Sequence, residues 1–339
     1  MLSLSGLERL NAWRQGIAPW PPLYHLTGAR PTGFGDGTAE AEMPATGWLT
    51  NAAGLIGGGT LAILADIAFG CAVESKLPAA TPYTTAELSL SFLRPARPGA
   101  MLTAHGQAIH VGRRVGLSEV FVLDPRDETL LAHGTSRLSI LPAIGRLPEP
   151  PADPPAYEPR SQSTPDPFQR PAPDATVIGQ DVWAELSGLE ILERQLRGEL
   201  PAPSIHELTG IRPTEVAEGR ATVVMPATEW LNSPTGWLQG GTIAMLADFA
   251  ITIAALTTAP AGQALAGLDL KVNFLRPVNG DGRELTARAE VEHSGRTLAI
   301  SRATISDADG RAVMLATGTT MRLPDRPASL EAGLELGQD

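Results

Sequence analysis

The alternation of apolar and polar positions places the strands of this chain. Leu88, Leu90 and Phe92 alternate with polar residues at positions 87, 89 and 91. This is typical of a strand that buries one face. The same alternation returns over residues 269–274, and together the two segments predict half-buried strands of a sheet.

A long apolar segment precedes each of these strands, over residues 58–75 and 240–257, and its length predicts a buried helix. Turn signals such as Val111-Gly112-Arg113 separate further predicted strands. These strands cover 37–43, 101–110, 115–123, 130–141 and 219–225, and short helices are predicted over 6–15 and 182–197. One long helix against a mostly antiparallel sheet is an α+β arrangement.

The chain contains this order of elements twice. Met43-Pro44-Ala45-Thr46-Gly47-Trp48-Leu49 returns, with one change, as Met225-Pro226-Ala227-Thr228-Glu229-Trp230-Leu231, an offset of 182 residues. A period this long indicates a duplicated domain, since solenoid repeats are much shorter. We expect an N-terminal domain over 1–141, a Pro-rich linker over 142–174, a C-terminal domain over 175–323 and an acidic tail over 324–339.

Composition limits the classes of partner. The 339 residues carry a net charge of −11, which argues against binding nucleic acid. The chain has no apolar run of the roughly 20 residues that span a bilayer, and residues 1–10 lack a signal-peptide pattern, so we expect a cytoplasmic protein that does not enter membranes. The single cysteine, Cys71, is expected to be a buried apolar residue.

Each long helix carries one aspartate, Asp66 or Asp248, among apolar residues. A carboxylate is costly to bury, so it is expected to be paired, hydrogen-bonded or functional. Glycines begin both helices, at Gly58 and Gly240, and leave backbone N–H groups free for an anion or a developing oxyanion. Small residues lie one turn before each aspartate and allow close approach of a ligand or a second helix.

One helix cannot bring both features to the same atom, because eight residues separate Gly58 from Asp66 by roughly 12 Å. If the repeats pack about a pseudo-twofold axis, the N-terminus of each helix lies near the aspartate of the other. We therefore predict an internal pseudo-dimer with two composite sites. The strands over 87–93 and 269–275 are predicted to pair antiparallel at its centre.

The segment with Asn51, Gly57-Gly58-Gly59, Asp66 and Thr85 resembles the hotdog-fold acyl-CoA thioesterases of the phenylacetyl-CoA thioesterase type. The resemblance covers nearly all of both repeats and implies a tandem double hotdog, a long central helix wrapped by an antiparallel sheet. It also implies hydrolysis of acyl-CoA thioesters without a further cofactor, and a homodimer of double hotdogs. In that family the glycine amide polarises the thioester carbonyl, the aspartate is nucleophile or general base, and a Ser or Thr positions water.

The two repeats retain different parts of the family pattern of an Asn, a His or Gln, a Gly, an Asp and a Ser or Thr. The first has Gly57 at the His or Gln position, and the second has Ser233 at the Asn position, next to Asn232, and Gly267 at the Ser or Thr position. Pairing across the pseudo-twofold axis implies a first site of Gln239, Gly240, Asp66 and Thr85, and a second of Asn51, Gly58 and Asp248. The first is more complete, and we expect it to be the main catalytic site.

Other residues are candidates for substrate binding. Arg113, Arg114 and Arg296 lie in predicted hairpin turns, where they are either solvated or in contact with coenzyme A phosphates. Trp48 and Trp230 precede the long helices and either line an acyl pocket or pack in the core. The recurring His25 and His206 are interpreted as structural.

Two other functions stay open from the sequence. A non-catalytic acyl-CoA binding protein would retain the fold without turnover. A hotdog hydratase or dehydratase would need a histidine paired with a carboxylate, and the sequence shows no such pair at a recognisable spacing. It also shows no metal-ligand spacing, so no metal is expected.

Overall fold

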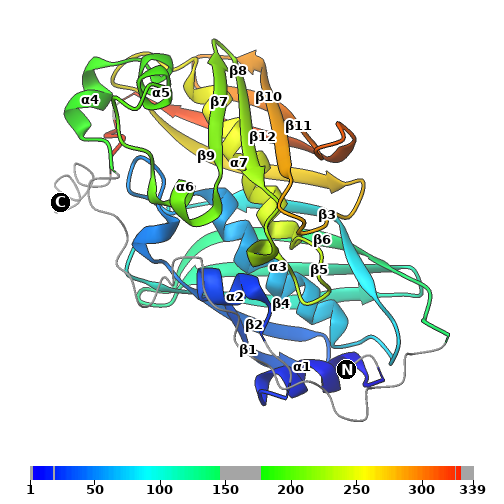
Figure 1. The fold of residues 1–339 in the computed structure, drawn as a ribbon. Helices are drawn as coiled ribbons and strands as arrows, with labels where there is room; N and C mark the ends of the chain where they lie inside the picture. The colour runs from blue at the N-terminus through cyan, green and yellow to red at the C-terminus, as the bar shows by residue number, and fades with distance from the viewer. Residues whose placement is uncertain (1–2, 18–19, 146–176, 325, 330–339) are drawn as a thin grey trace.

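The two repeats form one continuous sheet around two central helices (Figure 1). The computed structural model describes residues 3–17, 20–145, 177–324 and 326–329. Positions 146–174 of the predicted linker and 330–339 of the predicted tail lie outside the described residues. The domain boundaries themselves stay a prediction.

The N-terminal repeat has one long helix, three other short helical elements and six strands. Its elements are α1 (Gly6–Arg14), α2 (Pro22–Thr27), β1 (Arg30–Gly35), β2 (Thr38–Pro44), the 3-10 helix η1 (Gly47–Leu49), α3 (Gly58–Glu74), β3 (Tyr83–Phe92), β4 (Met101–Val111), β5 (Val115–Asp124) and β6 (Thr129–Ile140).

The C-terminal repeat follows the same order with one additional helix. Its elements are α4 (Gln180–Glu185), α5 (Gly188–Leu196), α6 (Ser204–Thr209), β7 (Arg212–Ala217), β8 (Arg220–Pro226), η2 (Glu229–Leu231), α7 (Gly240–Leu256), β9 (Ala264–Phe274), β10 (Glu284–Ser294), β11 (Leu298–Ser306) and β12 (Ala312–Leu323). None of the helices in the described part of the chain has both the length and the apolar character needed to cross a membrane.

The predicted junction between the repeats is confirmed. The 12 strands follow the order β1-β2-β4-β5-β6-β3-β9-β12-β11-β10-β8-β7, so β3 and β9 are neighbours at the centre. They pair antiparallel, with Leu90 opposite Leu270 and Leu88 opposite Val272. The two repeats thus share one sheet, and the α+β prediction and the internal pseudo-dimer are both confirmed.

One local prediction was wrong. The helix predicted over 182–197 is two helices, because Ser187 begins α5 with a capping box that uses Glu190. The segments that precede the strands predicted over 37–43 and 219–225 had no predicted element, and they form the short helices α2 and α6 and the strands β1 and β7. Pro31 of β1 and Pro213 of β7 lie on the two edge strands of the sheet, where proline is tolerated.

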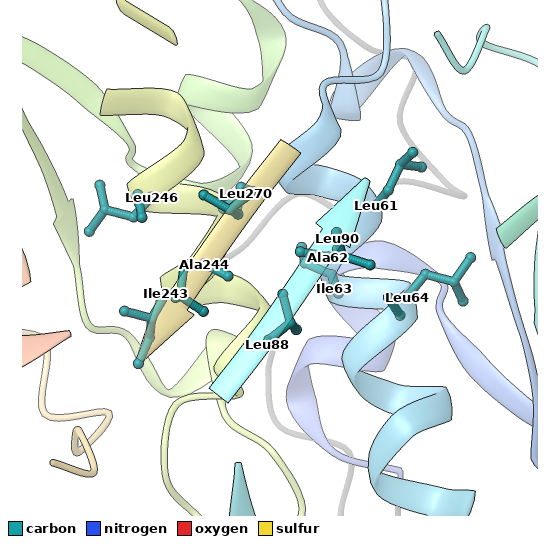
Figure 2. Packing of buried hydrophobic residues seen from close by; sticks show 14 of the residues in the cluster. Leu61, Ala62, Ile63, Leu64, Leu88, Leu90, Ile243, Ala244, Leu246 and Leu270 are labelled. Carbon is teal, nitrogen blue, oxygen red and sulfur yellow. The ribbon is translucent and has the colours of Figure 1, made fainter. Parts of the chain in front are cut away.

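The core lies between the sheet and the two long helices. Leu88, Leu90 and Leu270 of the central strands are fully buried and point toward the apolar residues of α3 and α7 (Figure 2). Cys71 is also buried and makes no disulfide, as expected. The core is therefore continuous across the junction of the repeats.

Glycines allow the two helices to touch where they cross. A Cβ atom on Gly241 would lie 2.4 Å from the carbonyl oxygen of Ala62 and 2.6 Å from the Cα of Ile63. A Cβ atom on Gly59 would lie 2.9 Å from the Cα of Met245. These distances are below van der Waals contact and involve backbone atoms, so any larger residue would push the helices apart.

We predict that Gly241→Ala destabilises the fold although alanine favours helix. Overpacking against backbone costs about 1–3 kcal/mol, which lowers the melting temperature by roughly 1–4 °C in a chain of this size. Thermal unfolding followed by circular dichroism measures this. Gly145→Ala is the control, because a Cβ there meets nothing within 4 Å, and equal melting temperatures of the two variants would contradict the close contact.

Candidate active site

Asp66 is held between the two repeats. It lies in the middle of α3 and is only 7% exposed. Its Oδ1 accepts a hydrogen bond of 3.0 Å from the Thr85 hydroxyl of β3, and its Oδ2 accepts one of 3.0 Å from the backbone N–H of Gly241, in the first turn of α7. The carboxylate is therefore fixed by a strand of one repeat and a helix of the other, and its catalytic role stays a prediction.

Gln239 completes this first site. It is the N-cap of α7, and its Nε2 donates a hydrogen bond of 3.1 Å to the carbonyl oxygen of Ile63, one turn before Asp66 on α3. Its Oε1 is buried and has no hydrogen-bond partner among the described residues. The carboxamide thus connects the two helices and leaves one acceptor available to a ligand.

Asp248 forms the second composite site by the reciprocal contact. Its Oδ2 accepts a hydrogen bond of 2.8 Å from the backbone N–H of Gly59, in the first turn of α3. Gly267, at the position equivalent to Thr85, has no side chain to bind the carboxylate. Gly57 is at the position equivalent to Gln239, and a Cβ atom added to Gly57 would meet nothing within 4 Å. The second site keeps the carboxylate and the helix N-terminus but lacks both polar side chains.

A phenylalanine covers each helix N-terminus. A Cβ on Gly240 would lie 3.1 Å from Cζ of Phe274, and one on Gly58 would lie 2.7 Å from Cε2 of Phe92. The N–H groups of Gly58 and Gly240 begin their helices and have no acceptor within them. An oxyanion bound there would meet the positive end of the helix dipole beside an apolar ring.

The pKa values of the two carboxyl groups are raised to a similar extent. Burial raises the pKa of Asp66 to about 6, against the opposing hydrogen bonds from Gly241 and Thr85. Burial also raises the pKa of Asp248 to about 6, where the Gly59 N–H opposes the shift and the charge of Asp269 adds to it. Both groups can therefore take up and release a proton near neutral pH.

The sites differ in their neighbouring charge. Asp269 is equivalent to Glu87, whose Oε2 lies 2.9 Å from Nη1 of Arg137 on the next strand. Arg137 stands opposite Glu87 in the first repeat. At the equivalent place in the second repeat, Thr319 of β12 stands opposite Asp269, and Asp269 has no ion pair among the described residues. Negative charge is thus neutralised near the first site and left unpaired near the second.

The structure does not bring every predicted residue to the sites. Asn51 Oδ1 accepts hydrogen bonds from the backbone N–H groups of Ala53 and Leu55, so it holds its own loop together. No hydrogen bond joins Asn51 to Gly58 or Asp248 in the described structure. The guanidinium groups of the predicted substrate-binding residues are solvent-exposed on hairpins and touch neither carboxylate; these are Arg113, Arg114 and Arg296.

The two tryptophans lie beside the opposite repeat. Trp48 is buried in η1, which packs against α6, and Trp230 is half-buried in η2, which packs against α2. Along the chain, each 3-10 helix precedes one of the long helices. Both also pack in the core, so an acyl-binding role for them stays a prediction.

Sequence reasoning missed four residues of the sites. The amides that hold the carboxylates belong to Gly59 and Gly241, one position after the predicted glycines, and Phe92 and Phe274 cover the helix ends. The sequence does contain a signal for Gly59 and Gly241, because the whole pair Gly58-Gly59 recurs as Gly240-Gly241. Only the crossing of the helices shows which amide meets the carboxylate.

Comparison with known proteins gives the same match in both repeats. A family model described as thioesterase superfamily matches residues 53–130 and 235–314. A 1,4-dihydroxy-2-naphthoyl-CoA hydrolase of Listeria monocytogenes is 30% identical over 103 residues, which cover 30% of this chain and 82% of the relative. The acyl-coenzyme A thioesterase PaaI of Escherichia coli is 32% identical over 95 residues, which cover 28% of this chain and 66% of the relative.

A solved structure matches the whole arrangement. The tesB protein of Mycobacterium avium subsp. paratuberculosis is similar over 94% of this chain and 100% of its own, with a TM-score of 0.54 and 15% identity. At this identity the likeness is one of fold. The two repeats therefore occur together elsewhere, in a chain of distant sequence.

We predict that the carboxyl carbons of Asp66 and Asp248 both titrate with midpoints near 6 in carbon-13 NMR spectra. Thr85→Val removes a hydrogen bond that favours ionised Asp66, so it raises that midpoint further. Asp248 has no contact with Thr85 and is the internal control in the same spectrum. A midpoint of Asp66 near 4, or an equal shift of both carboxyls, would contradict the assigned contacts.

Proposed function

The chain belongs to the thioesterase superfamily, and on this premise we propose that it hydrolyses acyl-CoA thioesters mainly at the site of Asp66, Thr85, Gln239 and Gly240. The observation that carries the proposal is the position of Asp66. Its carboxylate accepts hydrogen bonds from Thr85 of one repeat and from Gly241 of the other. It therefore lies where the N-terminus of α7 can hold a thioester carbonyl.

The groups of this site divide the reaction among them. The Gly240 N–H and the dipole of α7 stabilise the carbonyl oxygen as it becomes negative. Asp66 is the general base, because a carboxylate with a pKa of about 6 accepts a proton readily at neutral pH. Thr85 donates its proton to Asp66 and keeps its oxygen lone pairs free to accept a hydrogen bond from water.

The bonds change in two steps. Water adds to the carbonyl carbon and gives its proton to Asp66, and the oxyanion forms at the Gly240 N–H. The oxyanion then restores the carbonyl, the carbon–sulfur bond breaks, and the leaving thiolate takes the proton back from Asp66. The products are the free acid and coenzyme A, and the reaction uses water and the chain's own groups.

The second site supports less activity in this proposal. Gly57 and Gly267 supply neither a carboxamide nor a hydroxyl, and Asn51 is used by its own loop. Asp248 still faces the N-terminus of α3 through Gly59. A carboxylate there can bind a proton, but no side chain equivalent to Thr85 positions water beside it.

The proposed assembly is a homodimer of these double hotdogs. The support is the outer face of the shared sheet, which leaves Phe121, Ile300 and Leu315 between 39% and 45% exposed. A second copy could cover these side chains. The cytoplasmic location likewise stays a prediction.

We predict that Asp66→Asn abolishes most of the turnover, whereas Asp248→Asn costs little. Loss of one positioned acid–base group lowers the rate by about 10²–10⁴. Asparagine is nearly the same size as aspartate, so both variants should fold, and their melting curves should confirm this. Release of free thiol from a panel of acyl-CoA thioesters measures the rates.

Three other results of this comparison would contradict Asp66 as the main catalytic carboxylate. Equal losses would show two working sites, and a large loss only in Asp248→Asn would reverse the assignment. Wild-type rates in both variants would remove the carboxylates from the mechanism.

We also predict a single acidic limb in the pH dependence of kcat/KM. Asp66 must be ionised to accept a proton, so the rate falls about tenfold per pH unit below a midpoint near 6 and is level above it. Asp248→Asn keeps this profile and is the control. A rate that rises as the pH falls below 6 would contradict Asp66 as the base.

A further inference from the structure

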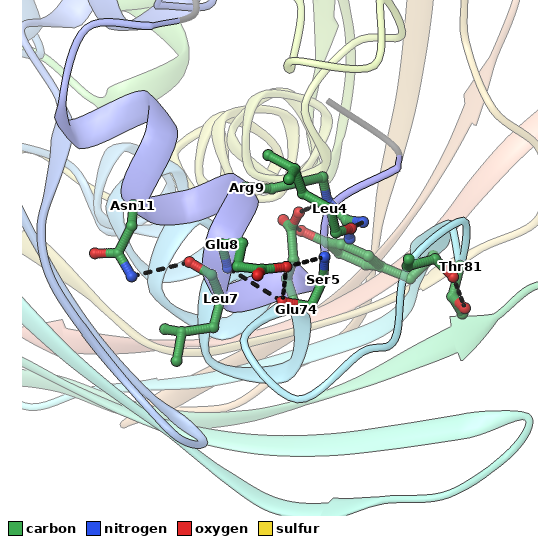
Figure 3. A network of polar contacts seen from close by, with 10 residues as sticks. Leu4, Ser5, Leu7, Glu8, Arg9, Asn11, Glu74 and Thr81 are labelled. Atoms are coloured by element: carbon green, nitrogen blue, oxygen red, sulfur yellow. Dashed lines mark hydrogen bonds and ion pairs between the residues drawn. The ribbon is translucent and has the colours of Figure 1, made fainter. Parts of the chain in front are cut away.

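The C-terminal repeat contains a helix, α4, that has no counterpart in the described part of the N-terminal repeat. The helices α1 and α5 are equivalent, because each begins with a capping box and docks beyond the end of its long helix. The N–H of Gly6 donates to the carbonyl of Leu77, and that of Gly188 donates to the carbonyl of Ala259. Figure 3 shows Arg9 of α1 directed toward the end of α3. The helix α4 is therefore an addition to the repeated fold.

This additional helix connects two loops that border the second composite site. Just before α4, the N–H of Ile178 donates a hydrogen bond of 2.9 Å to the carbonyl oxygen of Ala52, in the loop that leads into α3. Within α4, the carbonyl oxygen of Trp183 accepts one of 2.8 Å from the N–H of Gly262, in the loop that follows α7. In Figure 1 the helix lies next to the blue loop of the N-terminal repeat. Since the second site consists of the start of α3 and Asp248 of α7, α4 joins the loop before the one helix to the loop after the other.

A small apolar cluster, separate from the main core, fixes α4 in this position. Ile178 is 1% exposed and Trp183 is 8% exposed, and both belong to a cluster with Ile191 of α5. Ala52 of the N-terminal repeat and Leu256 at the end of α7 pack against this cluster. The indole Nε1 of Trp183 donates a hydrogen bond of 3.1 Å to the carbonyl oxygen of Ile178. The contact of α4 with the other repeat is thus built from buried apolar side chains as well as backbone hydrogen bonds.

The segment after β12 adds a second attachment. The Oε1 atom of Gln180, the first residue of α4, accepts hydrogen bonds of 2.9 Å and 3.1 Å from the backbone N–H groups of Ala328 and Ser329. Ala328 also packs against the apolar cluster. Three segments far apart in the sequence therefore meet at α4.

The corresponding loop of the first site is not covered in this way. It leads into α7, and its residues 234–237 are exposed. Trp237 is 42% exposed, whereas Leu55, at the equivalent position of the other loop, is half-buried. Among the described residues no helix joins this loop to the loop after α3. The two sites therefore differ in their surroundings as well as in their polar side chains.

We propose that residues 178–185 form a strap that closes the second composite site to acyl-CoA thioesters, so that substrate enters only the first site. This proposal rests on the proposed function. A thioester carbonyl at the Gly58 N–H would lie beside the loop that ends at Gly57, and the long coenzyme A part of the molecule needs room beside that loop. The strap holds this loop to the loop after α7. The absence of polar side chains at Gly57 and Gly267 agrees with a site that takes no substrate.

The test counts binding sites after the strap is released. Trp183→Asp places a charge in the apolar cluster, which is costly to bury and should undock α4. Ala184→Asp places the same charge on the neighbouring exposed position and is the matched control. Calorimetry with phenacyl-CoA, a thioether that water cannot cleave, should show one bound molecule per chain in wild type and Ala184→Asp, and two in Trp183→Asp. Two molecules in wild type, or one in folded Trp183→Asp, would overturn the strap. If a melting curve shows Trp183→Asp to be unfolded, Trp183→Ala takes its place.

A labelling measurement separates this proposal from the proposed function. Gly57→Cys puts a thiol at the second site, where a Cβ atom meets nothing within 4 Å, and the native Cys71 is buried. Adding Trp183→Asp should speed its reaction with dithiobis(nitrobenzoate) at least about tenfold, the effect of an opening made easier by about 1.4 kcal/mol. Adding Ala184→Asp should leave the rate unchanged. If phenacyl-CoA binds to no variant but this acceleration is present, the proposed function fails and the strap stands, whereas equal labelling rates would overturn the strap.

Discussion

The close crossing of α3 and α7 is the contact on which the rest of the structure depends. Each helix presents its first backbone N–H groups to a carboxylate in the middle of the other, and glycines allow the backbones to meet. The free N–H groups of a helix need an acceptor, and a buried carboxylate needs donors. Each helix therefore satisfies the other, and the contact that joins the repeats also builds both sites.

The composite nature of the sites followed from the sequence because it depends on backbone geometry alone. The helix rise separates Gly58 from Asp66 too far for one helix to use both, and the constant offset requires a second copy. The junction of β3 with β9 followed from the alternation of Leu88 and Leu270 with polar neighbours. Periodicity and repeat spacing are sufficient for inferences of this kind.

Other features depend on contacts through space that no local pattern records. The amide of Gly241 rather than that of Gly240 makes the short hydrogen bond to Asp66, and only the angle of the helix crossing decides between them. Asn51 matched a family pattern, yet its carboxamide oxygen binds its own loop.

The pairing of β3 with β9 inside one chain changes the conditions under which the sites exist. In a dimer of separate subunits, dilution removes the partner helix and with it half of each site. Here the partner is part of the same chain, so dilution does not remove it. The sites are thus independent of protein concentration, and each repeat is free to change without its copy changing in step, which two identical subunits encoded by one gene cannot do.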